Sequence, residues 1–223
     1  MPVVAITREF ATLGSEVAVA VASELNLALV HDEVIIAVAE RMTISPSLLG
    51  RYMDGVASQL ESMAVDPAGV SACLAEQVFA LAAKGDRMIS GCSATYLLRD
   101  FPSALRIRVR ASESVRAKRL MQQHPAMERG DACRQIALND ARQARSALRL
   151  FNVPDVLDST RYDMVLDTGS DSIGDCVDKI LGLWRLRCGG GNSAGHSPAK
   201  SSRNNSCTNS TLTWSMLGVA HCQ

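Results

Sequence analysis

The stretch that decides the fold is VVAITREFATLGSEVAVAVASEL, residues 3–25. Its first four residues are apolar, as in a strand buried on both faces of a parallel sheet. A polar turn follows, and Gly14 then opens a segment with Val17 and Val21 at helical spacing. A strand, a tight loop and a helix in this order aim loop amides and the positive end of the helix dipole at one point. The stretch therefore predicts a binding site for a phosphate group.

The composition is that of a globular chain with one substantial core. The 223 residues are 47% hydrophobic, and 23 basic residues balance 23 acidic ones, so no net charge points to nucleic acid or a membrane surface. Aromatic residues make up only 4%, too few for a surface that stacks single-stranded bases. No apolar run is long enough to cross a membrane, and Arg8 and Glu9 interrupt the place of a signal peptide's apolar region. Seven cysteines without CxxC pairs fit reduced thiols, so we expect a cytoplasmic protein.

Alternating strand and helix patterns predict an α/β protein. Strands are expected at residues 3–6, 27–30, 87–90, 104–110 and 162–167. Helices are expected at residues 14–25, 32–42, 46–63, 67–84, 94–99, 112–123, 128–150 and 172–184. Strands that alternate with helices form βαβ units, which give a parallel sheet between two layers of helices. The long helical stretch at 45–84 is expected to be an inserted subdomain that covers a ligand.

The folded α/β domain is expected to end at residue 187. Residues 1–187 carry all the predicted strands and helices. Residues 188–223 change abruptly to Gly, Ser and Asn, with two basic residues and no acidic one. A composition of this kind cannot bury a core, so we expect a disordered tail.

The first loop departs from the standard phosphate-binding pattern GxxxxGK[ST]. Only Gly14 stands in register. Ser15 replaces the lysine that contacts the β- and γ-phosphates, and Glu16 replaces the hydroxyl residue that contacts Mg²⁺. On this motif alone, an ordinary strand-to-helix turn is as well supported as a phosphate site.

Two other groups of residues are candidates for ligand contact. Cys92 and Ser93 follow the third predicted strand, at the sheet edge where ligands of parallel sheets bind. A simple helix cap is the alternative interpretation. Asp32 follows the second strand, and Arg41 lies two turns further on, so both are candidates for contact with an acceptor nucleotide. Acidic residues that cap a helix are the alternative for Asp32.

Arginines are concentrated in the second half of the chain. Arg116 and Arg119 lie on one predicted helix, while Arg142, Arg145 and Arg149 fall on one face of the next. A row of arginines over a phosphate site suits phosphoryl transfer, which depends on positioning and on neutralising developing charge. A solvated basic face is the commoner explanation for such a row. Only its combination with the first loop favours the functional interpretation.

These segments together resemble the cytidylate-kinase-like family of P-loop proteins. Val4–Ala18, VAITREFATLGSEVA, resembles the family's opening ISREYGSGGREIA, and Gly91–Asp100, GCSATYLLRD, resembles GRGANYILRD. Leu105–Arg119 is similar to the family's LRVFIYAPLEYRVKR, and Tyr162–Thr168 is similar to its YDLVINT. The segments occur in the same order over about residues 3–184.

The resemblance implies a P-loop three-layer fold, a five-stranded parallel sheet with helices on both faces. The family's fold also contains an insertion that binds the nucleoside monophosphate, expected here at about 45–84, and an arginine-bearing lid, expected at about 124–160. The resemblance also implies transfer of the γ-phosphoryl group of ATP to CMP, dCMP or a related monophosphate, with Mg²⁺ held largely by phosphates and water.

The residues expected to hold ATP are Arg8, Thr12, Leu13, Gly14, Ser15 and Glu16. Those expected to meet the acceptor are Asp32, Arg41, Cys92 and Ser93. Those expected to act as catalytic cations are Arg116, Arg119, Arg142 and Arg145. No side-chain metal site is expected, since His31 and His124 stand alone.

The chain differs from the family where phosphates meet cations. Ser15 and Cys92 replace arginines, and Ala11, Thr12 and Leu13 replace most of the family's GSGG. Each lost charge-assisted contact is worth about 1.5–3 kcal/mol, so the two losses predict a fall in rate on the order of a thousandfold. The alternative function is therefore a catalytically weak or inactive nucleotide-binding regulatory module.

Two further possibilities come from single features. Cys92 stands at a predicted helix N-terminus, where thiol pKa values fall, which would suit a redox-responsive protein. The apolar residues Ile35, Ile36 and Val38 belong either to the core or to a homodimer contact. Neither a nucleic acid nor a membrane is expected as a partner.

Overall fold

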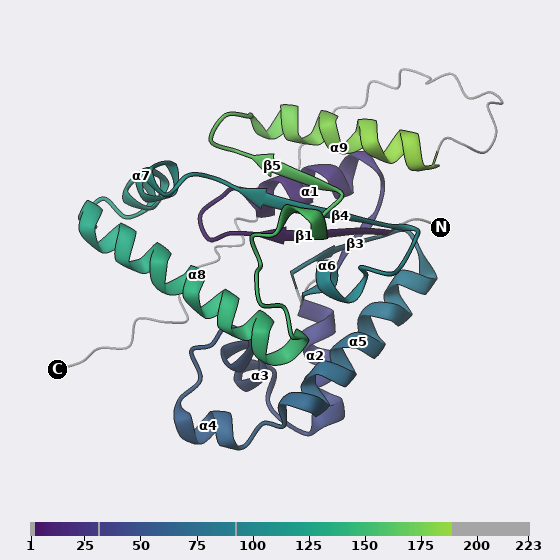
Figure 1. The fold of residues 1–223 in the computed structure, drawn as a ribbon, viewed down its shortest axis with the longest axis vertical. Coiled ribbons are helices and arrows are strands. Elements are labelled where there is room, and N and C mark those ends of the chain that lie inside the picture. The colour runs from purple at the N-terminus through teal and green to yellow at the C-terminus, as the bar shows by residue number, and fades with distance from the viewer. Residues whose placement is uncertain (1–2, 31, 92, 189–223) are drawn as a thin grey trace, which may run out of the picture. The chain divides into compact units, whose positions relative to one another are not determined.

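The fold is built on one parallel sheet with its phosphate-loop strand in the centre. The computed structural model describes residues 3–30, 32–91 and 93–188. The strands are β1 (Val3–Arg8), β2 (Ala28–Val30), β3 (Arg87–Ser90), β4 (Ala104–Arg110) and β5 (Met164–Asp167). Their order in the sheet is β2-β3-β1-β4-β5, and every neighbouring pair is parallel (Figure 1). The predicted five-stranded parallel sheet is confirmed.

Helices cover both faces of this sheet. They are α1 (Gly14–Glu24), α2 (Asp32–Met42), α3 (Pro46–Met53), α4 (Gln59–Met63), α5 (Pro67–Lys84), α6 (Ala94–Leu97), α7 (Glu113–Gln123), α8 (Arg129–Phe151) and α9 (Ile173–Cys188), with a short 3₁₀ turn at Ser159–Arg161. α1 and α9 pack on one face, while α2, α5 and α6 pack on the other (Figure 1). None of the described helices has both the length and the apolar character that a membrane span requires.

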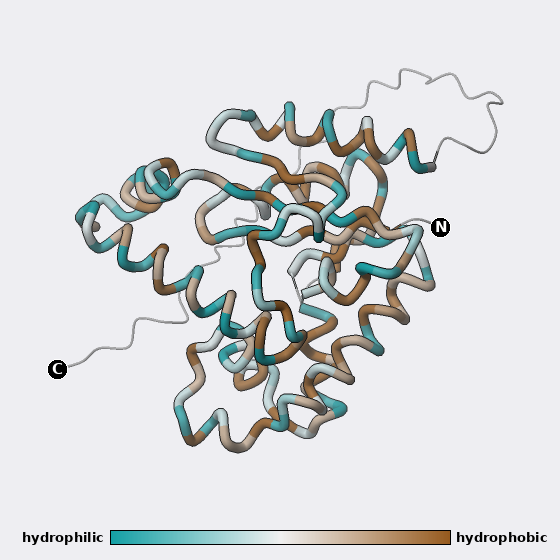
Figure 2. Tube along the Cα trace, viewed as in Figure 1, coloured by the Kyte–Doolittle hydropathy of each residue, from teal (hydrophilic) through white to brown (hydrophobic). Residues whose placement is uncertain are grey.

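Side-chain alternation along β1 builds the two cores. Val3 and Ala5 belong to the core under α2 and α5, whereas Val4 and Ile6 belong to the core under α1 and α9. Successive residues of a strand point to opposite faces, so one apolar run supplies both layers. In Figure 2, α8 alternates between hydrophobic and hydrophilic residues along its length.

The predicted insertion divides into two parts. α3 and α4 extend from the sheet at the lower edge of Figure 1, whereas α5 returns to the sheet and buries Val78 and Ala82 in the core. α4 is a separate helix because Gly55 has a φ of +69° and Ser58 begins a new capping box with Glu61. The insertion is therefore a short helical arm attached to one helix of the main body.

The apolar residues of α2 are divided between core and surface. Val38 is fully buried, and Ile35 packs against the same core. Ile36 is 44% exposed. Of the three residues considered for a dimer contact, only Ile36 therefore presents much of its side chain to solvent.

All described residues belong to one compact unit, which spans Met1–Gly191. Almost the whole of the predicted tail lies outside the described residues. The candidate residue Cys92 and the isolated His31 also lie outside them.

The arginines of β4 are paired with acidic residues on the face opposite α1 and α9. Leu105, Ile107 and Val109 point into the core beneath α1 and α9. The three arginines alternate with them, and their ion pairs are Arg106 with Asp163, Arg108 with Glu9, and Arg110 with Asp167. The basic face expected from the sequence is thus neutralised by carboxylates from three different segments.

Asp163 is the most heavily bonded of these acids, and its removal is expected to destabilise the fold. The carboxylate accepts the backbone N–H of Arg106 at 2.8 Å and an Nη2–H of Arg187 at 2.6 Å. Its side chain is only 11% exposed. We expect Asp163→Asn to lower the free energy of unfolding at pH 7 by about 1.5–3 kcal/mol, the range for hydrogen bonds to a charged group. Urea denaturation measures this loss, with the exposed Asp178→Asn as the control.

The effect of Asp163→Asn should also depend on pH. Burial alone raises the pKa of Asp163, but the hydrogen bonds from Arg106 outweigh burial, and the net pKa is lowered. A lowered pKa in the folded state stabilises the protein above the unfolded pKa of about 4, and this stabilisation is lost as the pH falls through the folded pKa. The difference between wild type and variant should therefore narrow below about pH 4. An equal difference at pH 7 and pH 3 would show that Asp163 does not act through its charge.

Candidate functional site

The loop between β1 and α1 has the backbone of an anion-binding turn. Ala11 and Leu13 have φ angles of +61° and +60°, whereas Thr12 and Gly14 are not among the residues with positive φ. Such alternation directs successive N–H groups to one side of the chain. No side chain caps the first turn of α1, so its N–H groups add to the same site. A left-handed backbone costs a residue with a Cβ atom about 1–2 kcal/mol, so this loop is strained.

The side chain of Arg8 packs against the loop at Gly14. Its Nη1–H donates to Ser90 Oγ at 2.8 Å, so the side chain joins the ends of β1 and β3. A Cβ atom on Gly14 would lie 2.6 Å from Arg8 Cβ and 3.3 Å from Val109 Cβ. Gly14 is therefore required by the packing of Arg8 against the loop, in addition to any role in admitting a phosphate.

The carbonyl side of the loop is bonded to the end of β5. Thr168 Oγ1 donates to the Thr12 carbonyl at 2.5 Å. Arg119 donates to the Ala11 carbonyl at 3.4 Å, to Thr168 Oγ1 at 3.0 Å and to the Thr168 carbonyl at 2.6 Å. Arg119, a predicted catalytic cation, thus lies at the loop but contacts its carbonyl oxygens.

Arg116 is held between two carboxylates. It donates to both oxygens of Asp140 at 2.9 and 2.8 Å, and its Nε lies 3.9 Å from Glu9. The side chain is 8% exposed, and Nε has no hydrogen-bond partner within the described residues. Burial alone lowers the pKa of Arg116, but Asp140 outweighs burial and raises it. The charge of this predicted catalytic residue is therefore already neutralised.

A cavity of about 700 Å³ lies beside the loop. It is lined by residues of β4 and the turn after it, of α8 and of the segment 154–157, together with Glu9, Arg116 and Asp167. Those of the first two groups are Arg108, Arg110, Ala111, Ser112, Asp140, Ala141, Gln143 and Ala144. Thr12, Gly14 and Ser15 are not part of this lining. The cavity is thus adjacent to the phosphate loop and shares with it the charged pair of Arg116 and Glu9.

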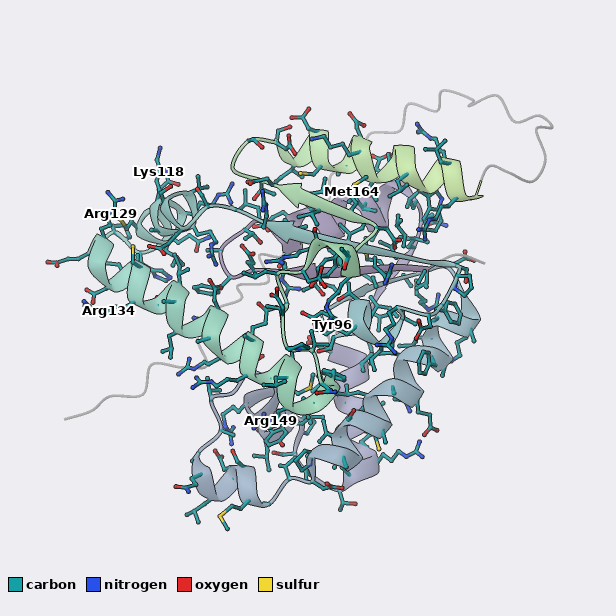
Figure 3. The ribbon with its side chains drawn as sticks, in the orientation of Figure 1. Tyr96, Lys118, Arg129, Arg134, Arg149 and Met164 are labelled. Carbon is teal, nitrogen blue, oxygen red and sulfur yellow. The ribbon has the colours of Figure 1, made fainter. Side chains whose placement is uncertain are left out.

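Arg142 and Arg149 of α8 contact the helical arm. A Cβ atom on Gly55 would lie 3.4 Å from Arg142 Cβ, so Arg142 packs against the turn between α3 and α4. The Arg149 guanidinium lies 4.0 Å from the centre of the Tyr52 ring and donates to the Tyr52 carbonyl at 2.8 Å (Figure 3). Arg145 is exposed between them.

The other end of the α7–α8 pair is a solvated basic surface. Lys118, Arg129 and Arg134 are exposed there and project outward in Figure 3. These three residues therefore form a solvated basic surface, the commoner explanation for a row of basic residues.

The predicted acceptor residues are not gathered at one point. Arg41 pairs with Glu76 of α5 at 2.6 Å. Nine positions separate it from Asp32, which places it about 14 Å along α2 from that residue. Ser93 lies closer to the loop, because α6 follows β3 and Thr95 Oγ1 lies 2.6 Å from Thr7 Oγ1 of β1. Asp32 opens α2 after the carboxyl end of β2.

Two residues of the site were missed from the sequence. Glu9 pairs with Arg108 and accepts the Ala111 N–H at 3.4 Å, which ties the loop to β4. Thr168 ties the loop to β5. Glu9 directly follows β1, and Thr168 directly follows β5. A polar residue directly after a strand of a parallel sheet is the signal that could have identified both.

The start of α1 fits the phosphates of ATP better than it fits a metal ion held by side chains alone. The alternating φ angles and the uncapped first turn of α1 fit the phosphates. Ser15 and Glu16, both exposed, stand where a standard loop has its lysine and its Ser or Thr. The described part of the chain has no group of three or more His, Cys, Asp or Glu that would hold a metal ion. Mg²⁺ typically needs only one or two carboxylates besides phosphates and water, and Glu16 in the first turn of α1 fits that role.

Several solved structures have a fold similar to that of this chain. Among solved structures, a protein from Eubacterium ventriosum matches with a TM-score of 0.62 at 19% identity, over 82% of this chain and 97% of that one. A gluconokinase from Sinorhizobium meliloti 1021 matches with a TM-score of 0.53 at 15% identity (84% and 94% covered). A shikimate kinase from Bacteroides thetaiotaomicron matches with a TM-score of 0.50 at 12% identity (83% and 99% covered). At these identities the likeness concerns the fold.

A search of curated proteins found no match. The family model described as the cytidylate kinase-like family matches residues 3–170, well over half of the chain. The order of strands, the loop after β1 and this match agree, and the chain belongs to the cytidylate kinase-like family.

Proposed function

We propose that this protein is a nucleotide-dependent phosphotransferase that moves the γ-phosphoryl group of ATP to CMP, dCMP or a related nucleoside monophosphate. The observation that carries the proposal is the loop of residues 11–14, whose φ angles alternate in sign directly before the uncapped N-terminus of α1. Membership of a kinase-like family supports phosphoryl transfer as the reaction class.

The phosphates of ATP would be held by the backbone N–H groups from Leu13 to Glu16. Thr12 contributes backbone only, since its hydroxyl donates to the Glu9 carbonyl at 2.8 Å. Arg8 would supply the positive charge that Ser15 lacks, because its side chain lies against Gly14. ATP supplies the phosphoryl group, and the chain's part is to position it and offset its charge.

The acceptor would lie between this loop and α8. Arg142 packs against the turn of the helical arm, Arg145 is exposed one turn further along α8, and Ser93 follows the end of β3. Arg41 is left out of this arrangement because it pairs with Glu76 at the far end of α2. The proposed acceptor contacts are therefore Arg142, Arg145 and Ser93.

A second candidate function is a nucleotide-binding module with little or no turnover. The observation that favours it is the neutralisation of Arg116 by Asp140 and Glu9, together with a serine at the lysine position of the loop. A site with bound ATP and few free cations would stabilise a ground state better than a transition state.

A coupled assay for ADP formation separates the two functions. Purified protein is given ATP, Mg²⁺ and, in turn, each nucleoside monophosphate of a panel, and we expect ADP release above the blank with CMP or dCMP. Calorimetry with ATP is run on the same preparation. Saturable ATP binding without ADP release for any acceptor would favour the binding module, and absence of both would reject both functions.

A further inference from the structure

The phosphate loop keeps its shape although the residues that favour such a shape are missing. Ala11 and Leu13 carry Cβ atoms but have the positive φ angles that glycine adopts without strain. Strained backbone of this kind persists only where its surroundings determine it more strongly than the local preference. Some contact outside the loop must therefore hold it.

Two carbonyl groups of the loop are held from one direction. The Thr12 carbonyl accepts from Thr168 Oγ1 at 2.5 Å, and the Ala11 carbonyl accepts from Arg119 at 3.4 Å. In a planar trans peptide the C=O and the following N–H point in opposite directions. Holding these two oxygens toward Thr168 and Arg119 therefore directs the N–H groups of Thr12 and Leu13 to the opposite side of the loop.

The holding groups are themselves fixed to the sheet. The Thr168 N–H donates to the Arg110 carbonyl of β4 at 3.0 Å, and the residue is 5% exposed. Its hydroxyl accepts from Arg119 Nη1 at 3.0 Å while donating to the loop. Bonds that are shielded from water in this way are stronger than exposed ones.

We infer that Thr168, supported by Arg119, is a positioning residue that holds the phosphate loop in its anion-binding conformation in place of the missing glycines. The inference rests on the proposed function for the identity of the anion. It assigns Arg119 a role through the loop backbone, where the sequence suggested direct contact with a phosphate.

Thr168→Val tests this inference, because valine keeps the shape of threonine and removes its hydroxyl. Backbone NMR chemical shifts and HN–Hα couplings of Ala11 and Leu13 report the sign of φ without any ligand. We expect the positive-φ signature to be lost in Thr168→Val and restored in Thr168→Ser. Thr95→Val, which removes an equally buried hydroxyl bonded to Thr7, should leave the signature unchanged. Retention of the signature in Thr168→Val would overturn the inference.

ATP affinity is a second measurement, and a glycine at position 13 should restore what Thr168→Val loses. Calorimetry with ATP and Mg²⁺ should show a roughly tenfold loss in Thr168→Val, the effect of one hydrogen bond on a binding constant. The loss should shrink to about twofold when Leu13→Gly is added, since glycine adopts positive φ unaided. An equal loss in both backgrounds would contradict the inference. If the wild type binds no ATP, the proposed function fails, while the NMR signature still decides the inference.

Arg119→Met provides an independent variant should Thr168→Val fail to fold. It keeps the side-chain stem and removes the donors to Ala11 and Thr168. We expect a weakened positive-φ signature at Ala11. An unchanged signature in this variant would count against the inference.

Discussion

Replacing Ser15 with lysine is expected to tighten ATP binding by about ten- to hundredfold. Ser15 is the second residue of α1, exposed, and stands where a standard loop carries its lysine. A charge-assisted contact with a phosphate is worth about 1.5–3 kcal/mol, which corresponds to that factor. If the new contact strengthens as charge develops on the transferred group, turnover should rise as well. Calorimetry with ATP and the coupled ADP assay measure the two effects.

The control for this variant is Val19→Lys on the same helix. Val19 is 55% exposed and lies about one turn further from the loop, so it adds the same charge without reaching the phosphates. Ser15→Lys should also lose a few tenths of a kcal/mol of stability up to about 1 kcal/mol, because a cation at a helix N-terminus opposes the dipole. Equal ATP affinity in both variants would mean that the phosphates do not lie at the start of α1.

Replacing Gly14 with alanine is expected to disrupt the loop and to destabilise the protein. The new Cβ atom would lie 2.6 Å from Arg8 Cβ and 3.3 Å from Val109 Cβ, so neither neighbour yields by simply changing a rotamer. Overpacking of a buried position typically costs about 1–3 kcal/mol. Displacement of Arg8 would also break its bond to Ser90 and remove the cation from the loop. We therefore expect a lower melting temperature and at least a tenfold loss of ATP affinity.

Two matched glycine variants are the controls. Gly50 in α3 and Gly182 in α9 have no atom within 4 Å of the added Cβ. Alanine at either position should raise stability by about 0.5–1 kcal/mol, because it lowers the entropy lost on forming a helix. A Gly14→Ala variant as stable as these two would show that Arg8 does not pack against the loop.

Much of the fold was predictable from local sequence. The apolar run at Val3 marked a strand buried on both faces, and the alternation of apolar residues with arginines at 104–110 marked its neighbour β4. The helix predicted at 67–84 is confirmed as α5, and local chemistry explains its start: Asp66 is the N-cap and Pro67 the first helical residue. These signals depend on a few adjacent residues, which is why they could be identified without the fold.

The boundary between α3 and α4 could not be placed from the same signals. The helical pattern continues through residues 46–63, but Gly55 with a positive φ and the Ser58 cap divide it. One glycine is tolerated inside many helices, so its conformation is decided by packing. Here Gly55 lies against Arg142 of α8, which is far away in the sequence.

The candidate site was predictable only in part, because its electrostatics depend on distant partners. The loop position and Gly14 followed from the strand–turn–helix pattern. The neutralisation of Arg116 depends on Asp140, 24 positions away, and the anchoring of Glu9 depends on Arg108, 99 positions away. Positive φ at Ala11 and Leu13 contradicts local preference and is set by Thr168 and Arg119. Of the predicted catalytic arginines, Arg116 is paired with Asp140, Arg119 donates to a loop carbonyl and Arg142 packs on the helical arm. Arg145 is exposed.

We propose above all that the N–H groups at residues 13–16 receive the phosphates of a nucleotide. The most direct measurement is a ¹H–¹⁵N NMR titration of the full chain with ATP and Mg²⁺, following each backbone amide. The account predicts saturable shifts at Leu13, Gly14, Ser15 and Glu16 that follow one binding curve. Amides there that stay unmoved while ATP binds elsewhere, for example around the cavity beside α8, would contradict it.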